Sequence, residues 1–249
     1  MAVEIGVVRS WQLDRIEGDT IPLNAASLAK QVVGHLALAL LDLDERLHDA
    51  ITVRHVLSHS TGLANWSPLD DPARPIRAPG TRFGYSGEGF ALLQRHLEHS
   101  TGCTLDELAQ QHVFTPLDMA ASRFGAPEVE FHHNRPLFTT AGDYARFLAH
   151  VLAIDDERWR PQCPIDDELA WGAGWGLELG SPVWGWQWGQ NDDASNFVIG
   201  CPSSGNGVVV LTDLPDGRAR YRAVVERELP GDHPSLRVEH NPAWLALFT

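Results

Sequence analysis

Ser27 and Lys30 lie three residues apart in the segment NAASLAKQV, and their side chains could form a nucleophile and its base. Residues three apart on a helix share a face, so the serine hydroxyl and the lysine amine can be in contact. Ser27 falls at the expected start of an apolar helix, where unpaired backbone N–H groups favour developing negative charge. The pair therefore predicts acyl-transfer chemistry through a covalent acyl-serine intermediate.

Lys30 is also the only lysine in the chain. The sequence has 19 basic residues, and all except Lys30 are arginine. Arginine keeps its proton in proteins, whereas burial can push a lysine toward neutrality. The residues around Lys30 are mostly apolar, so the sequence favours a role in proton transfer over one in surface charge.

Strands are expected at the two ends of the chain. The β-branched residues of 3–16 predict a strand or hairpin, and SNFVIGCP and NGVVVLTD predict two strands joined by the turn PSSG. A closing helix is expected near Arg218. The glycine- and tryptophan-rich stretch WGAGWGLELGSPVWGWQWGQ could form an aromatic wall over a site or pack in the core.

The middle of the chain is expected to be mostly helical. After the apolar helix from Ser27, a short helix in ITVRHVLSHSTGL should end at Gly62, and a loop should span 65–84. Further helices are expected in ALLQRHLEHSTG, LDELAQQHVFTPL and AGDYARFLAHVLA, the last with Thr140 as N-cap. These elements predict an α+β domain, with an antiparallel sheet from both termini and an inserted, mostly helical lobe. The expected boundaries are about 1–45 and 165–249 for the α/β lobe and about 46–164 for the helical lobe.

Five blocks resemble the serine β-lactamase-related family, which includes class C β-lactamases, penicillin-binding DD-peptidases, esterases and amidases. They are NAASLAKQV, ITVRHVLSHSTGL, PGTRFGYSGEGFALL, VFTPLDMAAS and WGAGWGLEL, in the family's order. The resemblance implies a β-lactamase/transpeptidase-like fold, with Ser27 and Lys30 as the SxxK pair of an acyl-enzyme hydrolase.

The family's second motif is a tyrosine two residues before an asparagine. Tyr85 falls on the tyrosine, so the resemblance implies that it shuttles a proton with Lys30. Gly87 replaces the asparagine. The work of the missing amide could fall to Glu88 as a substrate-binding residue, although Glu88 could equally serve only to open a helix.

The third motif of the family is a lysine or histidine, a small polar residue and a glycine on a strand lining the site. The stretch WGQNDDASNF places Gln190, Asn191 and Asp192 on this motif, without a cation. In the family this cation often holds a substrate carboxylate, so the absence of a cation argues against β-lactam or D-Ala-D-Ala substrates. Asp192 and Asp193 would rather suit an amine or a neutral ester. The oxyanion is expected to bind the N–H of Ser27 and another N–H near Asp193.

Several other functions are disfavoured. The net charge of −14 makes nucleic acid and anionic membranes poor partners, and neither a secretory signal nor a membrane-spanning segment is recognised. The three cysteines, far apart and without a CxxC pair, suggest reduced thiols in a cytoplasmic protein. His55 and His59 have HExxH spacing without the glutamate, and His132 and His133 lack a third ligand, so no metal is expected. No nucleotide-binding loop or GxSxG elbow is present, and no cofactor is expected.

The sequence therefore predicts a serine hydrolase that acts on a small-molecule ester or amide. One alternative is an acyltransferase that uses the same Ser27, Lys30 and Tyr85. Another is a catalytically silent binding or scaffold protein, because the second and third motifs are altered. The section before Ser27 is short for the family, so a trimmed sheet or a homo-oligomer that covers its edge is expected.

Overall fold

The large antiparallel sheet is built from both ends of the chain. The computed structural model describes residues 2–18, 20–67, 74–127, 134–191, 193–214 and 217–240. In these residues the sheet has eight strands in the order β2-β1-β13-β12-β11-β10-β9-β8. The N-terminal hairpin joins it through β1, where Ile5 pairs with Val210 of β13. The strands of this sheet are β1 (Val3–Arg9), β2 (Gln12–Glu17), β8 (Cys163–Pro164), β9 (Leu169–Trp171), β10 (Gly176–Glu178), β11 (Trp184–Asn191), β12 (Ala194–Cys201) and β13 (Asn206–Thr212).

Two small sheets and a set of helices complete the described structure. β7 pairs with β3 and β6, and β4 pairs with β5. The short strands are β3 (Leu23–Asn24), β4 (Arg46–His48), β5 (Ile51–Thr52), β6 (Arg123–Phe124) and β7 (Leu137–Thr139). The helices are α1 (Ala29–Leu40), α2 (Val53–Leu57), α3 (Gly87–Thr101), α4 (Leu105–Ala109), α5 (Ala141–Leu152) and α6 (Arg218–Glu228), with a π-helical turn at Gln110–Phe114 and 3₁₀ turns at Ala26–Leu28 (η1), Glu157–Trp159 and Pro234–His240.

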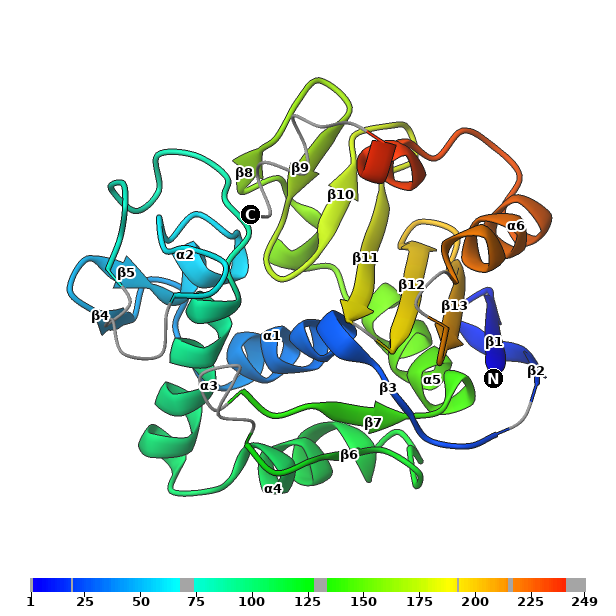
Figure 1. Ribbon diagram of the computed structural model, residues 1–249, viewed down its shortest axis with the longest axis horizontal. Coiled ribbons are helices and arrows are strands. Elements are labelled where there is room, and N and C mark those ends of the chain that lie inside the picture. The colour runs from blue at the N-terminus through cyan, green and yellow to red at the C-terminus, as the bar shows by residue number, and fades with distance from the viewer. Residues whose placement is uncertain are drawn as a thin grey trace.

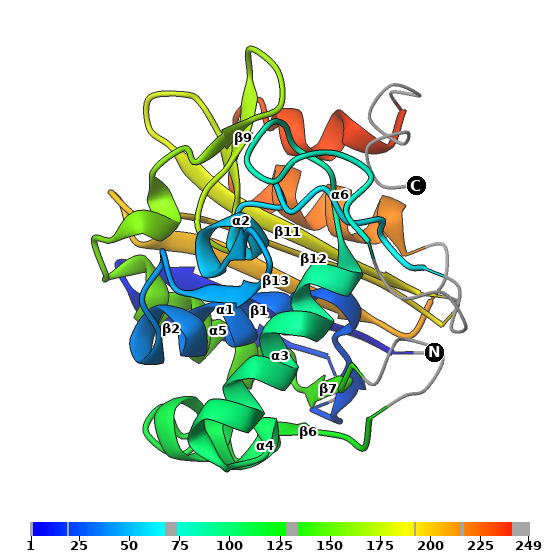
Figure 2. The same cartoon turned by 90° about the vertical axis from the view of Figure 1, so that its left-hand side faces the viewer.

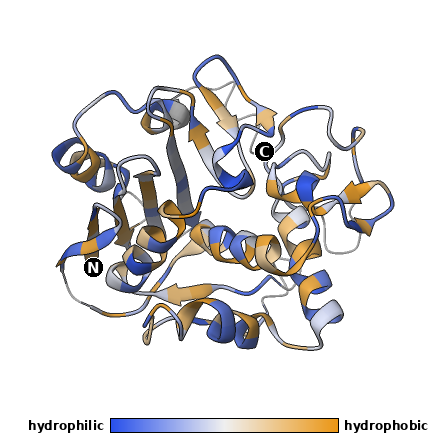
Figure 3. Cartoon of the chain, turned by 180° about the vertical axis from the view of Figure 1, so that it is seen from behind, coloured by the Kyte–Doolittle hydropathy of each residue, from blue (hydrophilic) through white to orange (hydrophobic). Residues whose placement is uncertain are grey.

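Helix α1 lies at the centre of the molecule. Figure 1 shows it between the large sheet and α3, and Figure 2 shows α3 crossing in front of it. Hydrophobic residues recur along this central helix in Figure 3, and Val32, Leu36 and Ala37 are fully buried. A helix that is apolar on most of its surface is stable only when other elements surround it. The turn at the N-terminal end of α1, which carries Ser27, meets the end of β11.

Buried polar contacts fix the segment that leads into α1. The carboxylate of Glu4, on β1, accepts the N–H of Ile21 at 2.7 Å and that of Ala141, at the start of α5, at 2.9 Å. The Tyr144 hydroxyl donates to the carbonyl of Leu28 at 2.8 Å, and complete burial raises the pKa of Tyr144 well above its usual range. Tyr144 thus anchors the first turn beside Ser27 as a neutral phenol.

The structure confirms the expected α+β architecture and most of its elements. The N-terminal hairpin, the strands β12 and β13 with their turn, and a helix from Arg218 lie where the sequence predicts them. Thr140 caps α5 by accepting the N–H of Asp143 at 3.1 Å. The sequence did not predict β9, β10 and β11 as strands, because glycine and tryptophan obscure their alternation.

Two other features differ from expectation. The short helix α2 ends at Leu57, before Gly62, because the chain turns into a left-handed conformation at His59 (φ 51°). Helix α5, in the middle section expected as a helical lobe, packs against β1 and β13 of the large sheet. No helix in the described ranges is both long enough and apolar enough to cross a bilayer.

Candidate active site

Ser27 and Lys30 are in contact at the head of α1. The Lys30 Nζ lies 3.0 Å from the Ser27 Oγ. Ser27 is half-buried, whereas Lys30 is 5% exposed, with its amine 5.3 Å from the ring centre of Tyr85 and 5.8 Å from that of Phe90. The Ser27 hydroxyl is therefore reachable from solvent, and the mostly buried Lys30 amine lies beside two aromatic rings.

The turn that presents Ser27 is strained and closely fitted. Ala26, just before Ser27, has a φ of 48°, a left-handed conformation that costs an alanine about 1–2 kcal/mol. The Asn24 side chain supports this turn by accepting the N–H of Ala26 at 2.8 Å. On the facing strand, a Cβ at Gly189 would lie 2.4 Å from the carbonyl oxygen of Ala25, so only glycine lets β11 approach the turn this closely. Strain of this kind is common where a fold presents a functional side chain.

Tyr85 and Gln187 form the second part of the site. The Gln187 amide Nε2 donates to the Tyr85 Oη at 3.1 Å and approaches the Ser27 carbonyl oxygen at 3.4 Å. Gln187 is fully buried on β11, and its Oε1 has no hydrogen-bond partner in the described structure. The structure thus brings Tyr85 to the Ser27–Lys30 pair and adds Gln187, which the sequence analysis did not single out.

The residues expected on the third motif lie further along β11. Gln190 is exposed and accepts a hydrogen bond from Arg218, and Asn191 accepts the N–H of Asp193 at 3.0 Å in the turn to β12. Gln190 and Asn191 line the cleft at Ser27, whereas Asp193 is exposed in the turn and Asp192 lies outside the described residues. The side-chain amide of β11 that hydrogen-bonds to the Tyr85 hydroxyl belongs to Gln187, three positions earlier than Gln190.

A signal for Gln187 is present in the sequence. The triplet Gln187-Trp188-Gly189 ends on glycine, as the family motif does, whereas Gln190-Asn191-Asp192 does not. Because β11 was not predicted as a strand, the sequence alone did not align the motif on Gln187. Gln187, like Gln190, is uncharged, so the expected absence of a cation holds at either register.

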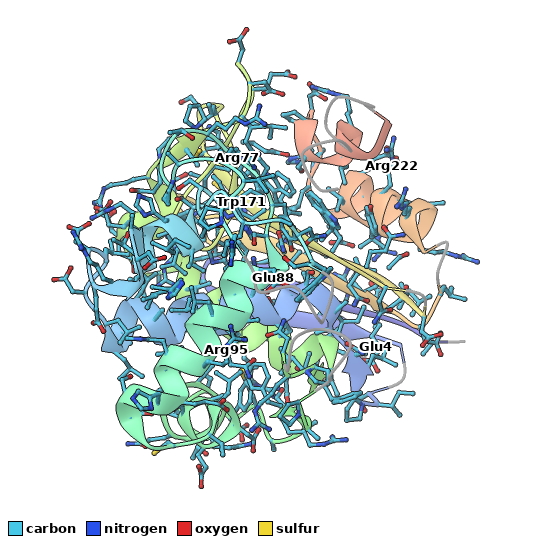
Figure 4. The ribbon with its side chains drawn as sticks, turned by 60° about the vertical axis from the view of Figure 1, so that its left-hand side comes forward. Glu4, Arg77, Glu88, Arg95, Trp171 and Arg222 are labelled. Carbon is cyan, nitrogen blue, oxygen red and sulfur yellow. The ribbon has the colours of Figure 1, made fainter. Side chains whose placement is uncertain are left out.

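Glu88 supports a loop and is not part of the cleft lining. Its side chain is 1% exposed and accepts the N–H of Ser67 at 2.8 Å, and its own N–H donates to the Asn65 carbonyl. In Figure 4 Glu88 is drawn at the upper end of α3, below Trp171. Glu88 therefore ties the loop that carries Trp66 to the start of α3.

Trp66 occupies the space beside Gly87, where the family has asparagine. A Cβ at Gly87 would lie 2.3 Å from the Trp66 ring. The Trp66 indole also lines the cleft beside Ser27 and Lys30. In this chain an aromatic ring thus takes the place that an amide would need.

This close contact predicts the effect of adding one methyl group. We expect Gly87→Ala to lower the free energy of unfolding by about 1–3 kcal/mol, because the methyl overlaps the Trp66 ring. Urea unfolding would measure the change. Gly89→Ala is the control, since its new Cβ would come no closer than 3.3 Å to the Thr61 methyl. The explanation fails if Gly87→Ala is equally destabilising in a Trp66→Ala background.

The cleft at Ser27 is small and rich in amide groups. It has a volume of about 110 Å³. Its walls combine apolar groups, side-chain amides and two basic side chains: Asn24, Ala26, Ser27, Ala29, Lys30, Trp66, Asn134, Arg135, Pro136, Gln190 and Asn191. The Arg135 Nε donates to Glu98 at 2.9 Å, so this charge is already paired. The described lining contains no acidic residue.

Several other tryptophans and histidines that the sequence singles out lie in the core or outside the cleft lining. Trp171, Trp175 and Trp186 are buried in the core, and Trp188 lies with its ring centre 6.2 Å from that of Tyr85. The Thr52 hydroxyl and the His55 Nδ1 lie 3.2 Å apart at the start of α2, whereas His132 and His133 lie outside the described residues. Within the described ranges no group of three or more His, Cys, Asp or Glu is arranged to hold a metal ion.

This chain is similar to a known family and to several solved structures. A family model described as Beta-lactamase matches residues 24–229. A solved β-lactamase from Mycobacterium bovis is 23% identical, with a TM-score of 0.72, covering 91% of this chain and 95% of that one. A D-stereospecific amidohydrolase from Streptomyces sp. is 15% identical, with a TM-score of 0.74 and coverage of 93% and 94%.

A third solved structure is an octameric penicillin-binding protein homologue from Pyrococcus abyssi. It is 16% identical, with a TM-score of 0.73, covering 96% of this chain and 76% of that one. No curated protein gives a significant match. The solved structures share the β-lactamase/transpeptidase-like fold with this chain, as the sequence predicts.

Proposed function

The chain belongs to the Beta-lactamase family, and from this premise we propose that it is a serine hydrolase that cleaves an uncharged ester or amide through an acyl-enzyme. The observation that carries the proposal is the 3.0 Å contact between the Ser27 Oγ and the Lys30 Nζ at the floor of a cleft. A half-buried hydroxyl beside a buried amine is the arrangement that lets a serine lose its proton as it attacks a carbonyl. Tyr85, linked through Gln187 to the carbonyl of Ser27, supplies a second proton carrier.

The first step is attack of the Ser27 Oγ on the substrate carbonyl carbon, with its proton passing to a neutral Lys30 amine. The carbonyl π bond opens, and its electron pair resides on the oxyanion. Collapse of this intermediate breaks the bond to the leaving group, which takes a proton from Lys30 through Tyr85. Water then attacks the acyl-serine, its proton returns through the same groups, and the acid product leaves with Ser27 restored.

The oxyanion is assigned to two backbone N–H groups. Ser27 supplies one, and we assign the other to Gln190 at the end of β11. Gln190 pairs with Ser195, whose N–H and carbonyl both contact the Thr212 hydroxyl on the β13 side. Directly opposed residues of an antiparallel pair both face their partner strand or both face away, so the N–H of Gln190 points away from β12. That direction leads to the cleft it shares with Ser27, which moves the second donor from the expected Asp193 to Gln190.

The neutral Gln187 supports an uncharged substrate. Gln187 hydrogen-bonds to the Tyr85 hydroxyl, and the basic Arg135 of the cleft wall is paired with Glu98. A substrate carboxylate would lose its hydration without gaining a strong ionic partner. The amide groups of the cleft instead match the carbonyl and N–H groups of a neutral acyl chain.

A substrate panel tests this proposal. We expect p-nitrophenyl acetate or butyrate to be hydrolysed with a kcat/KM at least about 100-fold above that for nitrocefin, since about 3 kcal/mol separates a matched from an unmatched charge. Absorbance of the released nitrophenol and of opened nitrocefin measures both. A kcat/KM for nitrocefin equal to that for the esters would overturn the substrate proposal.

The same ester reaction separates the two alternatives when the free acid and the acylated acceptor are quantified as well as the nitrophenol. With an added alcohol or amine, a hydrolase releases the free acid at an unchanged yield, whereas an acyltransferase diverts the acyl group to the acceptor. A silent binding protein consumes no ester and is not labelled by a fluorophosphonate. Either of these two results would replace hydrolysis as the function.

A further inference from the structure

His59 is a buried residue that the proposed mechanism does not use. It follows α2, is 1% exposed and has a left-handed backbone with φ of 51°. Its imidazole stacks on the Tyr85 ring, with ring centres 4.1 Å apart and planes 28° apart. A non-glycine residue held in this backbone region costs about 1–3 kcal/mol, which suggests that the fold needs this side chain here.

His59 also holds the backbone on both sides of Tyr85. The N–H of Gly84 donates to the His59 carbonyl at 2.8 Å, and the N–H of Ser86 donates to the His59 Nδ1 at 3.1 Å. Together with the ring stack, these contacts fix the residue before Tyr85, the residue after it, and the phenol itself.

The contact with Ser86 requires a neutral imidazole. Burial holds the pKa of His59 well below its ordinary value, and Lys30 lowers this pKa further when its amine carries a proton. Because Nδ1 accepts the Ser86 N–H, the ring proton resides on Nε2, which has no hydrogen-bond partner among the described atoms. An unpaired buried N–H costs about 1–3 kcal/mol of stability, so an apolar side chain at this position would cost the fold less.

We propose that His59 is a positioning residue for proton transfer, which fixes the Tyr85 phenol through the Nδ1 bond to Ser86 and the stacked ring. This inference rests on the proposed roles of Ser27, Lys30 and Tyr85. His59 does not touch the substrate in this account. Its removal should therefore lower kcat and leave KM nearly unchanged.

A double-mutant cycle with Tyr85 tests the proposal. We expect Tyr85→Phe to lower kcat for p-nitrophenyl acetate about 100-fold, and His59→Phe to lower it about 10-fold with KM changed less than about threefold. In the Tyr85→Phe background, His59→Phe should cost no more than about twofold, because the phenol that it positions is already absent. His59→Asn should retain more kcat than His59→Phe, since its Oδ1 can accept the Ser86 N–H and asparagine tolerates the left-handed backbone.

Phe83→Leu is the matched control. Phe83 packs against the same His59 and Trp171 rings and is similarly buried. We expect it to lower the thermal midpoint while changing kcat less than about threefold, and any loss should persist in the Tyr85→Phe background.

Three results would overturn the proposal, and each differs from failure of the proposed function. They are a His59→Phe enzyme with wild-type kcat, an equal loss with and without Tyr85, and a His59→Asn enzyme no better than His59→Phe. Should His59→Phe fail to fold, the cycle is run with His59→Asn, and an equal loss in both backgrounds again contradicts the positioning role. Failure of the proposed function has another signature, since wild-type protein would then show neither ester hydrolysis nor labelling of Ser27.

Discussion

Replacing Lys30 by arginine is expected to abolish turnover as fully as replacing it by alanine. Arginine preserves the positive charge but keeps its proton in proteins, so it cannot accept the proton of Ser27. Its planar guanidinium must also fit where the present amine lies between the Tyr85 and Phe90 rings. General-base catalysis contributes about 10²–10⁴-fold, so kcat/KM for p-nitrophenyl acetate should fall by at least about 100-fold in both variants.

Chemical restoration gives this prediction its control. Lys30→Cys, alkylated with 2-bromoethylamine, regains a primary amine at the end of a chain of nearly lysine length. We expect it to recover at least about a tenth of wild-type kcat, because a titratable amine is what the site requires. Wild-type protein treated in the same way controls for alkylation of Cys103, Cys163 and Cys201, which are free thiols. Near-normal turnover by Lys30→Arg would show that Lys30 acts as a charge and not as a base.

Ser27→Ala is expected to lower kcat/KM more than the Lys30 variants do, with little change in the free energy of unfolding. Removal of the nucleophile eliminates the acyl-enzyme route, so kcat/KM should fall by about 10³-fold or more, to whatever the oxyanion donors alone provide. Ser27 is half-buried, and its Oγ takes part in a hydrogen bond with the Lys30 Nζ. The free energy of unfolding should therefore change by no more than about 1 kcal/mol, the usual worth of one hydrogen bond.

A second serine provides the comparison for this variant. Ser100 is exposed in the last turn of α3, where its hydroxyl donates to the Leu97 carbonyl at 3.3 Å. Ser100→Ala should keep wild-type kcat/KM within about twofold. If Ser27→Ala retained more than about a tenth of the activity, another residue would be the nucleophile.

The sequence could predict the contact between Ser27 and Lys30 because its geometry is local. One helical turn is enough to bring Ser27 and Lys30 together, and the Ser27 Oγ lies 3.0 Å from the Lys30 Nζ. The hairpin of the N-terminus and the Thr140 cap of α5 were predictable for the same reason, since both depend on neighbouring residues.

The opposite wall of the site could not be read from the sequence in this way. Gln187 meets Tyr85 across 102 positions of the chain, and its place depends on the register of a strand rich in glycine and tryptophan. A one-residue change in register reverses the face on which every side chain lies, so without the strand only the glycine at 189 favours Gln187 over Gln190. Glu88 lies in the first turn of α3, as one of the two readings of the sequence expected, but its contact with Ser67 was hidden because Ser67 lies in a loop with no periodic pattern.

His59 shows what composition and spacing leave out. Its HExxH-like spacing from His55 suggests a metal site, which the missing glutamate disfavours, and does not point to Tyr85. Its contacts with Gly84, Tyr85 and Ser86 depend on a left-handed turn that no local signal marks.

Peptide mapping of a covalent adduct would show whether Ser27 is the acyl-accepting nucleophile. Protein is incubated with a fluorophosphonate, its intact mass is measured, and the modified peptide is sequenced by tandem mass spectrometry. We expect one adduct per chain, located on Ser27, absent from Ser27→Ala and formed much more slowly in Lys30→Arg. An unlabelled wild-type protein, or an adduct on any other residue that persists in Ser27→Ala, would contradict it.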